Sequence, residues 1–263
     1  MVRKETNYQT VLYEQTGGVA SIILNRPKSY NAFTEEMNSE IIDALKSASE
    51  DRAVRCIIIT GKGKAFCSGE DLAGVNEDTD HGTFLRTRYH PMVKAIKQTP
   101  KPIVAAVNGI AAGAGMSLAL AADFRLVQPE SKFVSAFMNI GLIPDSGFLY
   151  ALPRLIGYAK ALEISVLGKP IKGTEAFHLG LATEVIESAD WEEKVAAFAY
   201  SLAALPTKSF ALIKSHMMDG MHAPFDVMLE KEAQAQYIAG KTADHHEGLQ
   251  AFKEKRKPNF TGE

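Results

Sequence analysis

Two almost unbroken apolar runs, VRCIIIT at 54–60 and IVAAV at 103–107, constrain the fold more than any other feature of this chain. A strand that is apolar at successive positions is typical of a parallel sheet whose two faces are both covered by helices. A helical pattern with Thr34 as its N-cap covers residues 34–49, and another covers 84–98, interrupted near Pro91. The alternation of strands and helices predicts an α/β fold built in layers.

Further elements extend this plan toward both ends of the chain. Residues 10–25 read as a β-hairpin turning at Gly17 and Gly18, and extended segments follow at 124–127, 132–135 and 183–186. Helical patterns fill the last part of the chain, at 148–168, 173–179, 190–204, 206–219, 223–238 and 241–254. We therefore expect a core of residues 1–200 and a helical C-terminal region of residues 201–263. No linker rich in Pro, Gly or Ser separates them, so they form one continuous domain.

Composition excludes several classes of function. The 263 residues carry a net charge of −2, which lacks the basic excess of nucleic-acid-binding proteins. No run of about 20 strongly apolar residues predicts a membrane span, and the N-terminus lacks the apolar segment of a signal peptide. Cys56 and Cys67 form neither a disulfide framework nor a metal-ligand pattern, and Cys56 reads as a buried thiol. We expect a cytoplasmic protein without a metal.

Candidate chemistry lies in two glycine-rich turns. FCSGEDL at 66–72 follows the first buried run, and NGIAAGAG at 108–115 follows the second and leads into a helix that begins near Ala114. Each turn taken alone reads as an ordinary strand-to-helix connection. If the two strands are neighbours, however, the N–H groups of both turns face one crevice. Two converging donors form an oxyanion hole, which would stabilise an enolate made from a thioester or a ketone.

Asp145 is the candidate acid–base group. It stands in GLIPDSG at 141–147, directly ahead of a predicted helix. One interpretation makes it an N-cap of that helix. The other places its carboxylate in the same crevice, where it could take a proton from the carbon next to a polarised carbonyl.

Together these segments resemble the enoyl-CoA hydratase/isomerase superfamily, also called crotonases. The likeness runs nearly end to end, in the ordered segments LNRPKSYNAF at 24–33, GKGKAFCSGEDL at 61–72, KPIVAAVNGIAAGAGMSLALAADFRL at 101–126, GLIPDSG at 141–147, ALPRLIG at 151–157 and EGLQAFKEKRKPNF at 247–260. It implies a spiral of ββα units, an acyl-CoA thioester substrate with no separate cofactor, and a homotrimer or a hexamer made of two trimers.

The resemblance also implies roles for individual residues. The backbone N–H groups of Glu70 and Ala114 match the two oxyanion-hole donors of the family. Lys28 matches a position near the CoA phosphates, although a solvated lysine is an equal alternative. Phe252 and Lys253 match the tail that closes over the nucleotide in the same or a neighbouring subunit; for Phe252, helix packing is the competing interpretation. The other substrate-binding positions implied are Ser68, Gly69, Asp71, Leu72, Gly113 and Phe137, with the Ser68–Asp71 loop at the adenine end.

Two departures from the family pattern bear on the reaction. Hydratases of the superfamily carry two glutamates that activate water, and their positions fall on Ser117 and Phe137 here. Neither residue can act as a general base, which leaves Asp145 as the one acid of the predicted site. An Asp in this position resembles the epoxyphenylacetyl-CoA isomerases of phenylacetate catabolism. The chain departs from them at Phe148, where a second glycine is expected beside the acyl pocket.

The sequence thus predicts an acyl-CoA isomerase that moves a double bond by proton transfer through Asp145, in phenylacetate or fatty-acid catabolism. Three alternatives stay open: an enoyl-CoA hydratase, a hydrolase or dehalogenase with Asp145 as nucleophile, and a CoA-ester-binding subunit without activity. His90 belongs to a segment that could line the acyl pocket.

Overall fold

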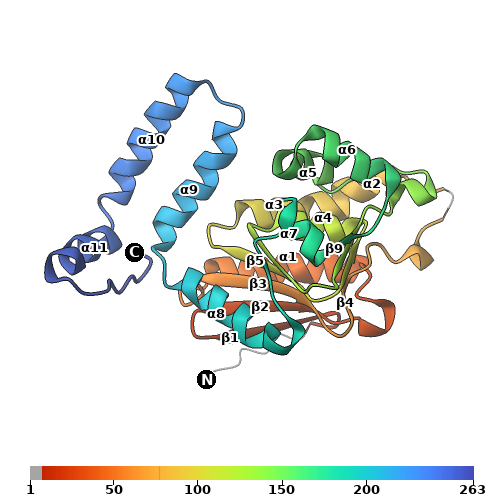
Figure 1. Cartoon of the computed structure of the whole chain (residues 1–263), viewed down its shortest axis with the longest axis horizontal. Coiled ribbons are helices and arrows are strands. Elements are labelled where there is room, and N and C mark those ends of the chain that lie inside the picture. Colours follow the sequence, from red (N-terminus) through yellow and green to blue (C-terminus); the bar gives the residue numbers. More distant parts are fainter. Residues whose placement is uncertain (1–7, 77) are drawn as a thin grey trace.

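Two sheets stacked in a spiral form the body of the molecule in the computed structural model, which describes residues 8–76 and 78–263 (Figure 1). The first sheet opens with the expected hairpin of β1 (Val11–Thr16) and β2 (Val19–Leu24). From β2 onward its strands run parallel, in the order β2, β3 (Cys56–Gly61), β5 (Ile103–Val107), β7 (Phe124–Val127) and β10 (Glu184–Val185).

The second sheet contains four short strands, β4 (Ala65–Cys67), β6 (Ile110–Ala112), β8 (Lys132–Val134) and β9 (Ile171–Lys172). Each of β3, β5 and β7 is followed at once by a strand of this sheet and then by helices, which confirms the predicted ββα spiral. The sequence did not predict β4 and β6. We expected plain glycine-rich turns there, whereas both segments pair with each other across the spiral.

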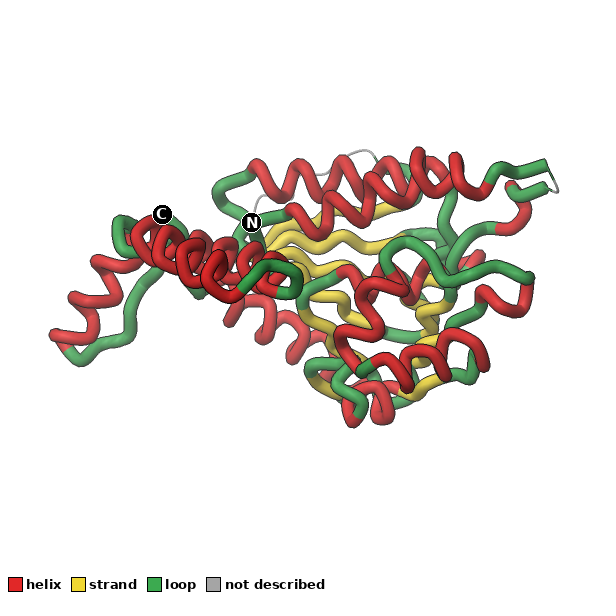
Figure 2. Tube along the Cα trace, turned by 90° about the horizontal axis from the view of Figure 1, so that it is seen from above, coloured by secondary structure: helices red, strands yellow, loops and turns green. Residues whose placement is uncertain are grey.

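Helices cover both faces of the first sheet (Figure 2). On one face, Ile57 and Ile59 of β3 pack in a core with α1 (Glu35–Glu50), α3 (His90–Gln98) and α4 (Ala114–Ala121). On the other face, Cys56 and Ile58 pack under α8 (Trp191–Ala203). This two-sided burial explains the unbroken apolar run of β3, because alternate residues of a strand point to opposite faces. The predicted N-cap is also confirmed, since the Thr34 hydroxyl accepts from the amide of Met37.

The remaining helices surround this body. The segment predicted as one helix at 148–168 is two helices, because Gly157 at φ 79° ends the first. The predicted break near Pro91 lies earlier, in a π-helix that precedes α3. The elements are η1 (Pro27–Ser29), η2 (Leu72–Gly74), α2 (His81–Phe84), the π-helix η3 (Leu85–Tyr89), η4 (Phe137–Ile140), α5 (Phe148–Ile156), α6 (Tyr158–Leu167), α7 (Gly173–His178), η5 (Ser188–Asp190), α9 (Thr207–Gly220), α10 (Phe225–Ala239) and α11 (Ala243–Glu254).

Residues 207–263, here called the C-terminal arm, extend away from the body in both views (Figures 1 and 2). Arg55 of the body donates to the Thr207 hydroxyl at 2.9 Å and to the Phe260 carbonyl at 2.7 Å. Lys214 of α9 forms an ion pair with Asp123 at 2.9 Å. No single helix in the described part of the chain is long and apolar enough to cross a membrane, and one pair, Ser188–Ala203 with Thr207–Gly220, reaches that length only across a 94° bend.

Candidate active site

A cavity of about 840 Å³ opens between the turn after β4, the helical segment 81–90, the start of α4 and the segment 136–146. Most of its lining side chains are apolar, and the polar ones come from the first glycine-rich turn, the segment 81–90 and the segment 136–146. Its walls consist of Ser68, Gly69, Glu70, Leu72, Val75, His81, Phe84, Leu85, Tyr89, His90, Gly113, Ala114, Ala136, Phe137, Asn139, Ile140, Leu142, Ile143, Pro144, Asp145 and Ser146.

The two glycine-rich turns meet at this cavity, as the sequence predicted for neighbouring strands. Strand β4 pairs with β6, with Cys67 opposite Ala111. The backbones then approach so closely that a Cβ on Gly69 would lie 2.9 Å from the Ala112 carbonyl oxygen and 3.5 Å from the Ala114 nitrogen. Only glycine avoids that clash, so the residue type at position 69 sets the spacing between the turns.

The amide of Glu70 is directed by its neighbours. Phe33 donates its N–H to the Gly69 carbonyl at 2.7 Å and accepts from the Asp71 N–H at 3.0 Å. Because the C=O and N–H of one trans peptide point in opposite directions, the Glu70 N–H points away from Phe33. Within the described part of the chain, this N–H donates to no other group. It is therefore a free donor on the cavity side of the turn.

Ala114 supplies the second free amide. It is the first residue of α4, where N–H groups have no partner within the helix and lie at the positive end of the helix dipole. Among the described residues, its N–H also donates to no other group. Gly113 makes this geometry possible, since its φ of 51° and ψ of −125° are open to glycine and costly for other residues.

The motif at 24–33 acts as a scaffold behind the first turn. Asn31 is fully buried and donates its amide to the Lys62 and Ala65 carbonyls while it accepts from the Arg26 N–H. These bonds fix the backbone around the start of β4. The motif therefore positions the turn without lining the cavity.

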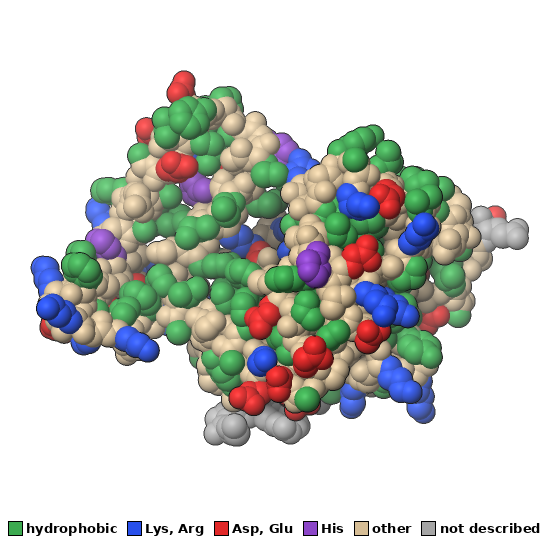
Figure 3. All heavy atoms as spheres, in the orientation of Figure 1, with side chains coloured by type: hydrophobic (Ala, Val, Ile, Leu, Met, Phe, Trp, Pro, Cys, Tyr) green, Lys and Arg blue, Asp and Glu red, His purple; other side chains and the backbone are tan. Residues whose placement is uncertain are grey.

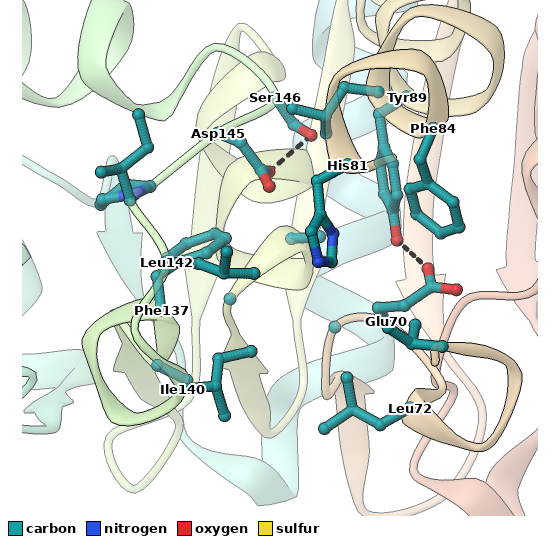
Figure 4. Close-up of a pocket in the computed structure, with 18 of the residues that line it drawn as sticks. Glu70, Leu72, His81, Phe84, Tyr89, Phe137, Ile140, Leu142, Asp145 and Ser146 are labelled. Carbon is teal, nitrogen blue, oxygen red and sulfur yellow. Dashed lines mark hydrogen bonds between the residues drawn. The ribbon is translucent and has the colours of Figure 1, made fainter. Parts of the chain in front are cut away.

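Asp145 lies on the wall opposite Glu70 (Figure 4). Its carboxylate accepts from the Ser146 hydroxyl at 2.8 Å and caps no helix, since α5 begins after Gly147 without a side-chain cap. The N-cap interpretation is thus wrong. Burial raises the pKa of the Asp145 carboxyl, while the Ser146 hydrogen bond and the imidazoles of His90 and His81 lower it. A raised carboxyl pKa suits a general base.

The positions of the two hydratase glutamates hold no acid. The Ser117 side chain is buried beneath the cavity and donates to the Asp145 carbonyl oxygen at 3.0 Å. Phe137 lines the cavity, as predicted. Phe148 was expected beside the acyl pocket, but it lies one layer behind Phe137, with ring centroids 6.0 Å apart.

Glu70 corrects one further prediction. The sequence left Asp145 as the one acid of the site, whereas the Glu70 side chain also lines the cavity. Its carboxylate accepts from the Tyr89 hydroxyl (Figure 4). It also lies 3.1 Å from the Arg88 guanidinium. Sequence reasoning missed Arg88, Tyr89 and His81 because helix periodicity marks a buried face and does not show which cavity that face borders.

Four of the predicted substrate-binding residues lie outside this cavity. Asp71 forms an ion pair with Arg26 at 2.8 Å and accepts from the Ala73 N–H. Lys28 is exposed on η1. Phe252 and Lys253 lie on α11, and Phe252 is 84% exposed, so the helix-packing interpretation of Phe252 is wrong for the single chain.

No group of three His, Cys, Asp or Glu side chains in residues 8–76 and 78–263 could hold a metal ion. Cys67 lies close to the site but is fully buried in β4, and this burial raises the pKa of its thiol to about 12. A thiol in that state is inert as a nucleophile at neutral pH. The cavity instead brings together two free amides, the Asp145 carboxylate and the Glu70 carboxylate, which Tyr89 and Arg88 already contact.

Known proteins resemble this chain over nearly its whole length. The model of the enoyl-CoA hydratase/isomerase family matches residues 14–263. The chain belongs to this family. It is 42% identical to the probable enoyl-CoA hydratase of Rhodobacter capsulatus, over 97% of this chain and 99% of that one. It is 38% identical to the 1,2-epoxyphenylacetyl-CoA isomerase of Escherichia coli, over 93% and 95%.

The fold agrees equally well with a solved structure. The enoyl-CoA hydratase of Bacillus anthracis superposes with a TM-score of 0.91 at 34% identity, covering 97% of this chain and 100% of that one. The protein is therefore an enzyme of the enoyl-CoA hydratase/isomerase family.

Proposed function

We propose that the enzyme is an acyl-CoA isomerase in which Asp145 moves a double bond by carrying a proton. The observation that carries this proposal is the placement of the Asp145 carboxylate and the free amides of Glu70 and Ala114 around one cavity. This arrangement supplies both requirements of the reaction, a base and a stabilised oxyanion.

The proposed reaction begins when the thioester oxygen of a 3-enoyl-CoA accepts from the two amides. Asp145 takes a proton from C2, and the electron pair of the broken C–H bond forms an enolate whose negative oxygen remains in the hole. The protonated Asp145 then returns the proton to C4, which gives the 2-enoyl-CoA and restores the carboxylate. No water takes part, so one carboxylate suffices.

Hydratases of the family use two glutamates that activate water, and the two matching positions of this chain carry no carboxylate. Ser117 is buried and Phe137 is apolar. The Glu70 carboxylate is already engaged by Tyr89 and Arg88. The occupied state of Glu70 therefore favours isomerisation over hydration.

The experiment that tests the proposal compares Asp145→Asn with Asp43→Asn, a matched change on the exposed face of α1. Removing the base should lower kcat for isomerisation of a 3-enoyl-CoA by about 10²–10⁴-fold and leave the affinity for acyl-CoA near that of wild type. Asp43→Asn should behave as wild type. More than half of the wild-type activity in Asp145→Asn would refute the role of Asp145.

A second candidate function is hydrolysis or dehalogenation with Asp145 as nucleophile. His81 and His90 line the same cavity and act electrostatically on the Asp145 carboxyl, so a base for water stands close to a covalent Asp145 intermediate. A single turnover in ¹⁸O-labelled water separates the two candidates. If ¹⁸O enters the Asp145 carboxylate, Asp145 has acted as a nucleophile. If the carboxylate stays unlabelled, Asp145 has acted as a proton carrier.

The acyl group that this site would accept is large and apolar. Phe84, Phe137 and Leu142 line the part of the cavity beyond the amides, and a relative acts on an epoxyphenylacetyl thioester. An aromatic or medium-chain acyl group would exclude water from these walls, whereas a four-carbon group would leave them wet. We therefore extend the proposal to aromatic or fatty acyl-CoA catabolism.

We also propose that the chain assembles as a homotrimer or as a hexamer of two trimers. The C-terminal arm carries exposed apolar side chains that the single chain leaves without cover, and Figure 3 shows hydrophobic side chains over the arm and along the hollow beside it. Exposed apolar areas of this kind mark protein interfaces. The exposed Phe252 would then act in a neighbouring subunit.

A further inference from the structure

The carboxylate of Glu70 is held from the opposite helix by two adjacent residues. The Tyr89 hydroxyl donates to one oxygen (Figure 4). The Arg88 guanidinium lies 3.1 Å from the other. The Arg88 guanidinium in turn lies over the Phe84 ring, 4.1 Å from its centroid. The side chain of the residue whose backbone N–H is one proposed oxyanion donor is thus fixed at its far end.

Both partners belong to the π-helix η3, a rare type of element that is frequently found at functional sites. Tyr89 is 2% exposed and meets Phe33 edge-on, with ring centroids 5.5 Å apart. Phe33 is the residue whose backbone bonds to Gly69 and Asp71 on either side of Glu70. Tyr89 therefore contacts Glu70 directly and also contacts the residue that directs the Glu70 amide.

The pairing also solves an electrostatic problem. An unpaired carboxylate in this cavity would repel the negative charge that forms on the thioester oxygen. Burial raises the pKa of the Glu70 carboxyl, and the Tyr89 hydrogen bond and the Arg88 charge lower it. Arg88 and Tyr89 thus partly neutralise the negative charge of the Glu70 carboxylate, which weakens its repulsion of an oxyanion held by the Glu70 amide.

We propose that Glu70 is a positioning residue, whose side chain, held by Tyr89 and Arg88, fixes the direction of its own backbone N–H in the oxyanion hole. The inference rests on the proposed function, because it assumes that this amide binds the thioester oxygen. It assigns no proton transfer to Glu70. In this role the Glu70 oxygens are needed as hydrogen-bond acceptors, and the basicity of the carboxylate is not needed for the reaction.

The test uses this distinction between acceptor and base. Glu70→Gln keeps an oxygen that accepts from Tyr89, Glu70→Ala removes it, and Tyr89→Phe removes the donor alone. Tyr150→Phe is the matched control, since its hydroxyl lies outside the cavity, 3.2 Å from His222. The first measurement is the absorption spectrum of cinnamoyl-CoA bound to each variant, which shifts to the red when the thioester carbonyl is polarised. The second is the kcat and KM of each variant for isomerisation of a 3-enoyl-CoA.

We expect a red shift in wild type and in Tyr150→Phe. Glu70→Gln should keep most of the shift and a kcat within about fivefold of wild type, because a neutral acceptor replaces a charged one. Glu70→Ala and Tyr89→Phe should lose about half of the shift, since one of two donors is misdirected. Their kcat should fall by about 10–100-fold with KM nearly unchanged.

Three results would overturn the inference. A Glu70→Gln variant that keeps the full red shift but is as slow as Glu70→Ala would make Glu70 a proton carrier. An unchanged shift and kcat in both Glu70→Ala and Tyr89→Phe would remove the positioning role and leave the proposed function intact. No red shift in wild type would remove the proposed oxyanion hole, and the inference with it.

Discussion

Ser146 combines two properties that fix the geometry of Asp145, the proposed base. Its φ of 54° lies in the left-handed region, which costs on the order of 1 kcal/mol for a non-glycine residue. Its hydroxyl donates to the Asp145 carboxylate at 2.8 Å. Backbone strain of this kind persists at functional sites where the surroundings enforce it. We attribute the conformation to the need to hold Asp145 against the cavity.

Removing this hydroxyl should shift the pH dependence of the reaction. Asp145 must be ionised to take a proton, so kcat/KM rises as pH rises through its pKa. The Ser146 hydrogen bond lowers that pKa, and Ser146→Ala should therefore move the acid limb of the profile to higher pH. Ser201→Ala, on the exposed surface of α8, is the control and should leave the limb in place. If the acid limb of the Ser146→Ala profile stays at the wild-type pH, the Ser146 hydrogen bond does not affect the pKa of Asp145.

Single residues differ in how far the sequence predicts them. Asp145 was singled out because an acid in a turn ahead of a helix is either an N-cap or a candidate base, and the resemblance to the family favoured the base. The Glu70 side chain and Tyr89 were not, because their contact joins two segments 19 residues apart across a π-helix. A π-helix shifts the face on which every following side chain lies, and no periodicity in the sequence marks it.

Among the helices, α4 has the most direct link to the proposed chemistry. All eight of its residues are buried, and a Cβ on Gly115 would lie 2.1 Å from the Cys67 carbonyl oxygen. The small side chains thus let α4 approach β4 and bring its first amide beside that of Glu70. The sequence predicted this helix and its start because Gly113 and the run of small apolar residues are local signals.

Replacing Ala114 by proline should remove its amide as a donor while helix α4 stays folded. Proline at the first helical position is sterically tolerated, so the protein should fold, but the donor is absent. Turnover should fall by about 10²–10³-fold, as for the loss of one oxyanion donor. Ala114→Gly keeps the donor and is the control, with turnover close to wild type. Circular dichroism confirms folding, and a folded, fully active Ala114→Pro enzyme would exclude this amide from the oxyanion hole.

The short strands of the second sheet show where prediction from local sequence fails. Strands β4 and β6 have three residues each and stand among glycines, so their composition indicates turns. They form because β3 and β5 are already neighbours in the first sheet, which brings the following segments together. The pairing is a consequence of the spiral, and only the resemblance to a known family anticipates it.

On the scale of the whole molecule, the body and the arm are stabilised in different ways. The body has two buried clusters, one on each face of the first sheet. The arm is anchored by Arg55 and by the Lys214–Asp123 pair, whose side chains are 9% and 14% exposed. Next to the Arg55 contact with Phe260, Asp244 accepts from the Thr261 and Gly262 amides and fixes the tail. The arm thus keeps its direction while its apolar side chains stay exposed.

The exposed apolar side chains of the arm predict how an introduced negative charge should affect the proposed assembly. Phe225 of α10 is 74% exposed and Met217 of α9 is 72% exposed, although both side chains are apolar. If a second chain covers them, a carboxylate at either position would be buried without a partner, at a cost of several kcal/mol. Phe225→Glu and Met217→Glu should therefore lower the mass measured by light scattering toward that of one 28.6 kDa chain. Lys46→Glu, on the exposed face of α1, should leave the wild-type mass unchanged.

Because Arg55 and Lys214 hold the arm within one chain, helix content should stay constant in all three variants. A wild-type protein that is monomeric at micromolar concentration would refute the proposed assembly.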